Sequence, residues 1–250
     1  MKQYGLIGLP LTHSFSQNYF SEKFRHLNLP DHRYSNFPLS SIEELLPLIQ
    51  AEKNLCGLNV TIPYKEKVMP LLNEMSEEAK SIGAVNTISI SRNNNTIHLK
   101  GYNTDYYGFA QSVKPFLLNT HHRALILGTG GASKAVEYFC RQTGIDFLKI
   151  SREKGRGNLT YTELNEYILK NYLFIINTTP LGMSPGTENY PDIPYECISS
   201  GHLMVDLIYN PAETLFLEKA KKRGAVTLNG MAMLKLQAEA SWKIWNEENR

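Results

Sequence analysis

Two side chains in the first half of the chain, Lys65 and Asp105, have the chemistry of a proton-transfer pair. Lys65 follows a short strand-like run that ends at Pro63, and it is placed to open the next helix. A lysine in a cleft can donate or accept a proton once its environment lowers its pKa, and a carboxylate such as Asp105 could orient it. Lys65 can equally be a surface ammonium, and Asp105 can equally be a helix N-cap. The two residues are a candidate catalytic pair, with both structural alternatives open.

Five other polar side chains lie where they could contact a small polar molecule. Asn59 and Thr61 share one face of their strand, because side chains alternate along a strand with a period of two. Ser14 and Ser16 precede the first predicted helix, where two hydroxyls could hold a carboxylate or could simply cap the helix. Asn86 is a polar residue within a predicted strand and can be structural. All five are candidates for substrate binding.

A glycine-rich loop separates a predicted strand from a predicted helix at Gly128-Thr-Gly130-Gly131-Ala132. In a dinucleotide site the first glycine permits a tight turn, and the second lets the backbone approach the pyrophosphate. The anion then lies against the N–H groups at the start of the helix. Ser133 stands where this motif usually has its third glycine. A plain turn is the alternative, but the strand before the loop and the helix after it favour a cofactor-binding loop.

The end of the next predicted strand bears on the choice between NAD and NADP. An acidic residue there suits the ribose hydroxyl of NAD, whereas an arginine suits the 2′-phosphate of NADP. Ser151 and Arg152 therefore favour NADP. Glu153 opposes that preference, and Lys154 or Arg156 could offset Glu153. An ordinary solvated cluster of charges is the alternative.

The composition of the whole chain excludes several classes of protein. Its 250 residues include 26 Lys and Arg, 24 Asp and Glu and 42% hydrophobic residues, which argues against a nucleic-acid binder and against disorder. No apolar run approaches the ~20 residues of a membrane span, and no signal peptide is recognisable. Cys56, Cys140 and Cys197 have no metal-ligand spacing, so we expect reduced thiols and no metal site. We expect a soluble enzyme of the cytoplasm, with no membrane or nucleic-acid partner.

Short apolar runs alternate with helical patterns, which is typical of an α/β protein with a mainly parallel sheet. The length fits one large domain or two small ones. Strands are expected at 3–8, 33–37, 57–61, 84–91, 96–100, 124–128, 147–151, 173–177, 203–206 and 225–228. Helices are expected at 16–27, 41–52, 66–72, 105–117, 132–143, 161–170, 214–223 and 230–249.

Eight stretches of the chain resemble those of the shikimate dehydrogenase family. They occur in the family's order and span nearly the entire chain, and this order is specific although no single stretch is. The stretches are Gly8-Leu-Pro10-Leu-Thr-His13-Ser14-Phe-Ser16, Gly57-Leu-Asn59-Val-Thr61-Ile-Pro63-Tyr-Lys65, Gly83-Ala-Val-Asn86-Thr87, Gly101-Tyr-Asn103-Thr104-Asp105-Tyr-Tyr-Gly108, Gly128-Thr-Gly130-Gly131-Ala132, Asn177-Thr-Thr-Pro180-Leu-Gly182-Met183, Asp206-Leu-Ile-Tyr209-Asn-Pro211 and Asn229-Gly230-Met-Ala-Met-Leu-Lys-Leu-Gln237.

The resemblance implies two α/β domains. Residues 1–102, completed by the C-terminal helix 231–250, would form a substrate-binding and catalytic domain with a mainly parallel sheet. Residues 103–230 would form a Rossmann domain that binds NADP. The implied activity is the reversible, NADPH-dependent reduction of 3-dehydroshikimate to shikimate in aromatic amino-acid biosynthesis. The implied partner is this small-molecule substrate, and the family includes both monomers and homodimers.

The resemblance also implies roles for individual residues. Lys65 and Asp105 would be catalytic, with the lysine ammonium stabilising charge on the carbonyl oxygen and donating the proton, and with Asp105 orienting it. The substrate carboxylate would be bound by Ser14, Ser16 and Tyr209, and the ring hydroxyls by Asn59, Thr61, Asn86, Asp105 and Gln237. The cofactor would be bound by Gly128, Gly130, Gly131, Ala132, Ser151, Arg152, Leu207 and Gly230, with Met183 as a further candidate beside the nicotinamide.

Two alternative functions stay open at this point. A quinate/shikimate dehydrogenase that uses NAD would be favoured by an acidic residue at position 151 or 152, and neither position has one. A non-catalytic dinucleotide-binding regulatory module of the same fold would be favoured by loss of Lys65 or Asp105, and both are present. The family often has Asn-Arg-Thr where this chain has Ser151-Arg152-Glu153, so the strictness of NADP over NAD is also open.

Overall fold

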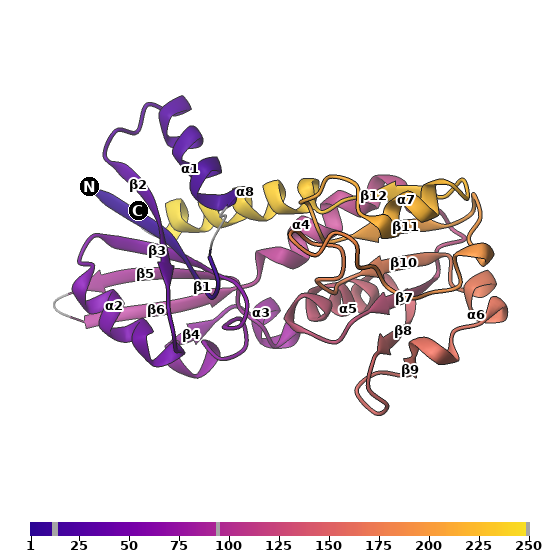
Figure 1. Ribbon diagram of the computed structural model, residues 1–250. Helices are drawn as coiled ribbons and strands as arrows, with labels where there is room; N and C mark the ends of the chain where they lie inside the picture. Colours follow the sequence, from indigo (N-terminus) through magenta and orange to yellow (C-terminus); the bar gives the residue numbers. More distant parts are fainter. Residues whose placement is uncertain (12–14, 94–95, 249–250) are drawn as a thin grey trace. The chain divides into compact units, whose positions relative to one another are not determined.

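The chain folds into two compact α/β units in a computed structural model that describes residues 1–11, 15–93 and 96–248 (Figure 1). Unit 1 comprises Met1–Thr104 and Ala238–Arg250, and unit 2 comprises Asp105–Gln237. The sequence-based boundaries, after residues 102 and 230, lie slightly earlier in the chain. The C-terminal helix α8 (Met231–Glu248) contributes residues to both units. No helix of the described residues is long and apolar enough to cross a membrane.

Unit 1 is built on a mixed six-stranded sheet with the order β2-β1-β3-β5-β6-β4. The pairs β1–β2, β1–β3 and β4–β6 are parallel, and the pairs β3–β5 and β5–β6 are antiparallel. Its elements are β1 (Lys2–Gly8), α1 (Phe15–His26), β2 (His32–Pro38), α2 (Leu45–Ala51), β3 (Leu55–Val60), β4 (Glu74–Met75), α3 (Glu77–Ile82), β5 (Thr87–Asn93) and β6 (Thr96–Tyr102), with short 3₁₀ helices at Ile42–Glu44 and Met69–Leu71.

The end of α8 completes the core of unit 1, next to α1 (Figure 1). Trp245 has no exposed surface, stacks on Tyr4, and donates a hydrogen bond from Nε1 to the Ile88 carbonyl at 3.0 Å. Gly57 lies directly against this indole, because a Cβ at Gly57 would approach Trp245 Nε1 to 2.2 Å. The residue after Cys56 on β3 must therefore be glycine for the C-terminal helix to pack here. Helix α2 covers the opposite face of the sheet, with Leu45 and Ile49 buried in a second core.

Unit 2 contains a six-stranded, entirely parallel sheet with the order β12-β11-β10-β7-β8-β9. Counted from β7, this order is the 3-2-1-4-5-6 arrangement of Rossmann folds, and it reverses between β7 and β10. Its elements are α4 (Thr104–Val113), β7 (Arg123–Leu127), α5 (Gly131–Thr143), β8 (Asp146–Ser151), β9 (Leu159–Thr160), α6 (Glu166–Asn171), β10 (Phe174–Asn177), β11 (Leu203–Asp206), α7 (Leu215–Lys221) and β12 (Val226–Leu228), with 3₁₀ helices at Lys114–Phe116, Tyr161–Glu163 and Tyr195–Cys197.

Both faces of this sheet are buried, which is why its strands read as continuous apolar runs. Along β7, Ala124 and Ile126 belong to one core cluster, and Leu125 and Leu127 belong to another. Helices α4 and α5 supply the first cluster, and α6 and α7 supply the second. The α/β class expected from the sequence, with two domains, is the one observed.

Several predicted helices are wrong in detail. The segment 66–72 forms turns and the 3₁₀ helix Met69–Leu71, because Pro70 has no N–H to donate and its ring clashes with a preceding helical turn. Lys65 therefore lies in a turn and opens no helix. The segment 161–170 splits into a 3₁₀ turn and α6, because the Asn165 side chain accepts a hydrogen bond from Ile168 N and caps a new helix.

Helix α3 was not predicted at all, although the chain marks both of its ends. Ser76 caps its N-terminus by accepting a hydrogen bond from Ala79 N at 3.1 Å, and Gly83 ends it with a φ of 71°. The helix has only six residues, so its apolar periodicity is too short to recognise.

Candidate functional site

The glycine-rich loop of unit 2 lies at the carboxyl end of β7, where the strand order reverses. Gly128 has a φ of 110°, and a Cβ there would approach Thr178 Oγ1 to 2.7 Å, so both its backbone angle and its neighbour require glycine. Gly130 is the N-cap residue of α5 with a φ of −85°, and it has no side chain to cap the helix. A Cβ at Gly130 would meet no heavy atom within 4 Å, so the backbone there is open to close approach.

Ser133 fixes the conformation of this loop. It is fully buried, and its Oγ donates a hydrogen bond to the Gly130 carbonyl at 2.7 Å, as does its backbone N–H at 3.0 Å. Gly131 and Ala132 are the first two residues of α5, a helix of 13 residues. The positive end of such a helix attracts anions. An open backbone followed by the start of a helix is the arrangement that binding of a pyrophosphate requires.

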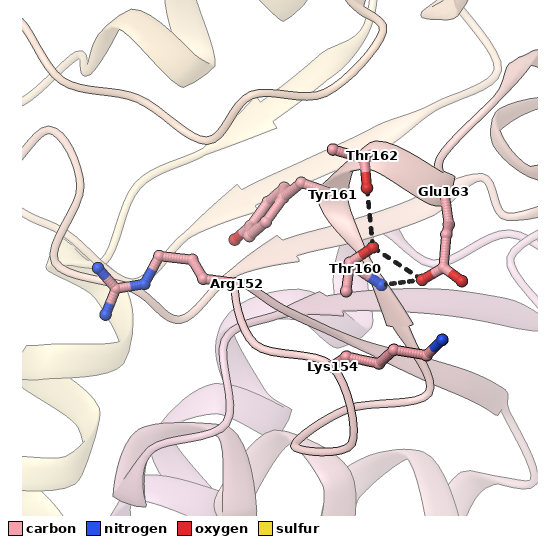
Figure 2. A pocket seen from close by; sticks show the side chains of 6 residues that line it. All are labelled: Arg152, Lys154, Thr160, Tyr161, Thr162 and Glu163. Carbon is pink, nitrogen blue, oxygen red and sulfur yellow. Dashed lines mark hydrogen bonds between the residues drawn. The ribbon is translucent and has the colours of Figure 1, made fainter.

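A pocket of about 530 Å³ lies beside the end of β8 (Figure 2). Arg152 and Lys154 extend from the loop after β8 in opposite directions, with the Tyr161 hydroxyl on the Arg152 side. Ser151 is buried at the strand end, and its Oγ accepts a hydrogen bond from Glu153 N at 3.1 Å. The pocket is lined by Arg152, Lys154, Thr160, Tyr161, Thr162 and Glu163.

The carboxylates near this pocket already have partners. Glu153 pairs with Arg156 at 3.2 Å, and neither residue lines the pocket. Glu163 accepts hydrogen bonds from the Thr160 N–H and hydroxyl at 2.6 and 2.7 Å, which holds the pKa of its carboxyl below the ordinary value. Within the described part of the chain, no carboxylate lies within ion-pair distance of Arg152. This charge pattern suits a phosphate.

Two polar residues with no role predicted from the sequence, Asn177 and Asp206, end the neighbouring strands β10 and β11. Asn177 Nδ2 donates a hydrogen bond to Asp206 Oδ1 at 3.1 Å, and both side chains are fully buried. Burial raises the pKa of Asp206 to about 6, although its hydrogen bonds to Thr214, Ile208 and Asn177 act in the other direction. The signal that could have identified them is a polar residue at the carboxyl end of two buried strands.

Leu207 and Gly230, two of the predicted cofactor residues, lie against each other in unit 2. A Cβ at Gly230 would approach the Leu207 carbonyl oxygen to 2.1 Å, so only glycine fits. Gly230 N also donates a hydrogen bond to the Ile208 carbonyl at 2.9 Å. Tyr209 is half-buried, which raises the pKa of its hydroxyl. Met183 is 47% exposed on the loop that follows β10.

In unit 1 three of the predicted substrate residues belong to one buried polar network. The Tyr34 hydroxyl is hydrogen-bonded to Ser16 and donates to Asn59 Oδ1 at 2.9 Å. Asn59 Nδ2 donates to Ser241 Oγ of α8 at 2.9 Å, and also lies 3.3 Å from the Asn86 carbonyl oxygen. The network joins α1, β2, β3 and α8.

The Asn86 side chain belongs to the same network through Thr87 and caps the start of α4. Its Oδ1 accepts a hydrogen bond from Thr104 N at 2.7 Å, and its Nδ2 donates to Thr104 Oγ1 at 2.9 Å. Thr104 immediately precedes Asp105 in the chain. Asn86 is therefore positioned to fix the backbone from which Asp105 continues.

The remaining predicted residues are divided between the two units. In unit 1, Thr61 follows β3, and Lys65 is half-buried, with its carbonyl accepting a hydrogen bond from Val85 N at 2.8 Å. In unit 2, Asp105 is buried in the first turn of α4, and Gln237 is buried with its Nε2 donating to the Leu234 carbonyl at 3.0 Å. Ser14 lies outside the described residues. Among residues 1–11, 15–93 and 96–248, no cluster of three His, Cys, Asp or Glu side chains could hold a metal ion.

A family profile and full-length relatives point to the same protein family. Residues 6–88 match the sequence profile of the shikimate dehydrogenase substrate binding domain. The chain is 40% identical over 259 residues to the shikimate dehydrogenase (NADP(+)) of Carboxydothermus hydrogenoformans, which covers 96% of this chain and 90% of that protein.

Two solved structures resemble the chain closely in fold. The shikimate 5-dehydrogenase of Thermus thermophilus, in complex with NADP(H) and shikimate, has a TM-score of 0.85 and 28% identity, covering 98% of this chain and 93% of that one. The quinate dehydrogenase of Corynebacterium glutamicum, in complex with NAD, has a TM-score of 0.85 and 27% identity with the same coverage. Similarity of fold alone therefore does not distinguish a protein that binds NADP(H) from one that binds NAD. The full-length sequence match shows that the chain belongs to the shikimate dehydrogenase family.

Proposed function

We propose that the chain is an NADP-dependent shikimate dehydrogenase that catalyses the reversible reduction of 3-dehydroshikimate to shikimate. The proposal rests on the arrangement of two features at the carboxyl edge of the unit 2 sheet. There the loop with Gly130 and the pocket with Arg152 follow the adjacent strands β7 and β8, as the pyrophosphate and the 2′-phosphate of one NADP molecule require. Unit 2 would thus be the NADP-binding domain, and unit 1 the substrate-binding domain.

Lys65 and Asp105 are proposed as the catalytic residues. NADPH, when bound, supplies the hydride that adds to the carbonyl carbon of the substrate. Negative charge then develops on the carbonyl oxygen, and the Lys65 ammonium would stabilise it and donate the proton. In the reverse direction neutral Lys65 would accept the proton from the hydroxyl. Asp105 would orient the lysine toward the reacting oxygen.

The substrate contacts are likewise proposed by motif position. Ser14, Ser16 and Tyr209 would bind the carboxylate, and Thr61, Asn86, Asp105 and Gln237 would bind ring hydroxyls together with Asn59. The amide of Asn59 is already hydrogen-bonded to Tyr34 and Ser241, so a ring hydroxyl would have to share or replace one of these bonds.

A matrix of initial rates with shikimate and quinate, each with NADP and NAD, tests the proposed function. We expect the highest kcat/KM with shikimate and NADP, because Arg152 is available to a 2′-phosphate. Preference for quinate and NAD would make the chain a quinate dehydrogenase. Turnover in none of the four combinations, with NADPH still bound, would favour a non-catalytic dinucleotide-binding module.

The preference for NADP is assigned to Arg152. Arg152→Ala should raise the KM for NADP by about 10- to 100-fold, since a hydrogen bond between charged groups contributes about 1.5–3 kcal/mol. The KM for NAD should change little, because NAD has no 2′-phosphate. Arg25→Ala, which removes an exposed arginine from α1 in unit 1, is the control and should leave both constants unchanged. Equal losses with both cofactors would show that Arg152 does not read the 2′-phosphate.

A cytoplasmic location is proposed as well. Cys56, Cys140 and Cys197 form no disulfide within the described residues, which fits a compartment where thiols stay reduced. Burial raises the pKa of the Cys140 thiol to about 12, which makes it unreactive.

A further inference from the structure

The carboxylate of Asp206 is the centre of a buried hydrogen-bond network at the carboxyl edge of the unit 2 sheet. It has no exposed surface, and its oxygens accept hydrogen bonds from Asn177 Nδ2 at 3.1 Å, from Ile208 N at 3.0 Å and from the Thr214 hydroxyl at 2.6 Å. No lysine, arginine or histidine of the described chain forms an ion pair with it. These three neutral donors are thus what compensates the loss of hydration of the carboxylate.

The three donors come from three separate segments. Asn177 ends β10, Ile208 follows β11, and Thr214 is the N-cap residue of α7. Asn177 passes the network on, because its Oδ1 accepts hydrogen bonds from Thr179 N at 3.0 Å and from Thr179 Oγ1 at 2.6 Å. Asp206 therefore holds together the turn after β10, the segment after β11 and the start of α7.

The segment after β11 carries two residues with proposed roles. Leu207 is next to Asp206, and Tyr209 is one residue beyond Ile208, whose N–H is bound by the carboxylate. Gly230 contacts the same segment, since its N–H donates a hydrogen bond to the Ile208 carbonyl. The backbone that presents Leu207 and Tyr209 is thus held at Ile208 by both its N–H and its carbonyl.

We propose that Asp206 is a positioning residue for the dehydrogenase reaction. It fixes the positions of Leu207 and Tyr209 without itself contacting substrate or cofactor. The inference rests on the proposed function, in which Leu207 contacts the nicotinamide and Tyr209 contacts the substrate carboxylate. A carboxylate is an unfavourable group to bury for stability alone. An apolar residue at position 206 could not replace it, because it could not accept the three hydrogen bonds that come from the three segments.

The test compares Asp206→Ala and Asp206→Asn with Asn165→Ala. Asp206→Ala removes all three acceptor contacts, and we expect a shikimate KM at least ~10-fold higher and a kcat at least ~10-fold lower. Asp206→Asn keeps an oxygen for Asn177 and Ile208, and the Thr214 hydroxyl can accept from the new amide, so both constants should return to within ~3-fold of the wild type. Asn165→Ala removes the N-cap of α6, a helix that supplies none of the three donors to Asp206, and should lower thermal stability without changing either constant.

Wild-type constants in Asp206→Ala, or a loss that Asp206→Asn does not reverse, would overturn the proposal. If Asp206→Ala does not fold, Thr214→Val replaces it in the test. This variant removes one donor to Asp206 and also the N-cap of α7. Asn165→Ala is its control, because it removes a helix N-cap without removing a donor to Asp206. We then expect a KM increase in Thr214→Val alone.

Hydrogen exchange separates failure of this inference from failure of the proposed function. The amides of Leu207, Ile208 and Tyr209 should exchange faster in Asp206→Ala, or in Thr214→Val, than in Asn165→Ala, whether or not the protein turns over shikimate. Inactive wild-type protein with this exchange pattern would overturn the function and keep the positioning role. Equal exchange in these variants would overturn the positioning role.

Discussion

Replacing Lys65 with alanine is expected to lower kcat for shikimate oxidation by about 10²–10⁴-fold, the usual contribution of a general acid or base. The KM for shikimate should change little, because the lysine acts mainly on the charge that develops in the transition state. The fold should survive, since the hydrogen bond from Val85 N is accepted by the Lys65 backbone carbonyl, which alanine retains. Steady-state rates with saturating NADP and thermal unfolding of the same sample provide the two measurements.

Lys67→Ala is the matched control for this variant. Lys67 lies two residues further along the same turn, is exposed, and has the same charge, so its loss should leave kcat unchanged. A similar drop in both variants would point to a general effect of positive charge on this turn. Near-full turnover in Lys65→Ala would exclude Lys65 as the proton donor.

The Rossmann-type unit was the part of the fold most readily predicted from the sequence. The predicted strands at 124–128, 147–151, 173–177 and 203–206 nearly coincide with β7, β8, β10 and β11. Their apolar runs are continuous because helices cover both faces of the sheet, and each run ends at a glycine or a polar residue. Local pattern and tertiary environment agree in this unit, so local reasoning was sufficient.

Unit 1 was less predictable because its contacts are remote in sequence. Asn59 is hydrogen-bonded to Tyr34 on one side and to Ser241 on the other, and no local signal connects β3 to the C-terminal helix. The prediction of a helix after Lys65 failed because the steric effect of Pro70 outweighed the helical propensity of its neighbours. The candidate residues could thus be named from motifs, whereas their hydrogen-bond partners required the structure.

The charged residues after β8 show that even the partners of residues close in sequence cannot be predicted from the sequence alone. In the sequence alone, Glu153 opposes binding of NADP, and either Lys154 or Arg156 could offset its charge. The structure pairs the two residues at 3.2 Å, away from the pocket that Arg152 lines. Which residue a carboxylate faces depends on the course of the loop, and composition does not encode that course.

Gly130→Ala should separate the cofactor-binding role of the loop from its structural role. The φ of −85° at Gly130 is accessible to alanine, and the new Cβ meets no heavy atom within 4 Å, so the free energy of unfolding should change by no more than about 1 kcal/mol. The methyl group would nevertheless occupy the side from which a pyrophosphate approaches the backbone. Overpacking of this kind costs about 1–3 kcal/mol, so the Kd for NADPH should rise by about 5- to 150-fold.

Gly128→Ala is the informative comparison, because there the strain lies in the protein itself. Its φ of 110° and the 2.7 Å approach of a Cβ to Thr178 Oγ1 should lower the free energy of unfolding by about 1–3 kcal/mol. Fluorescence titration with NADPH in the absence of shikimate, beside thermal unfolding, resolves the two effects. An unchanged Kd in Gly130→Ala would mean that no pyrophosphate lies against this residue. A loss of affinity with preserved stability would assign the open backbone of Gly130 to cofactor binding, because Ser133 holds its carbonyl in place in both variants.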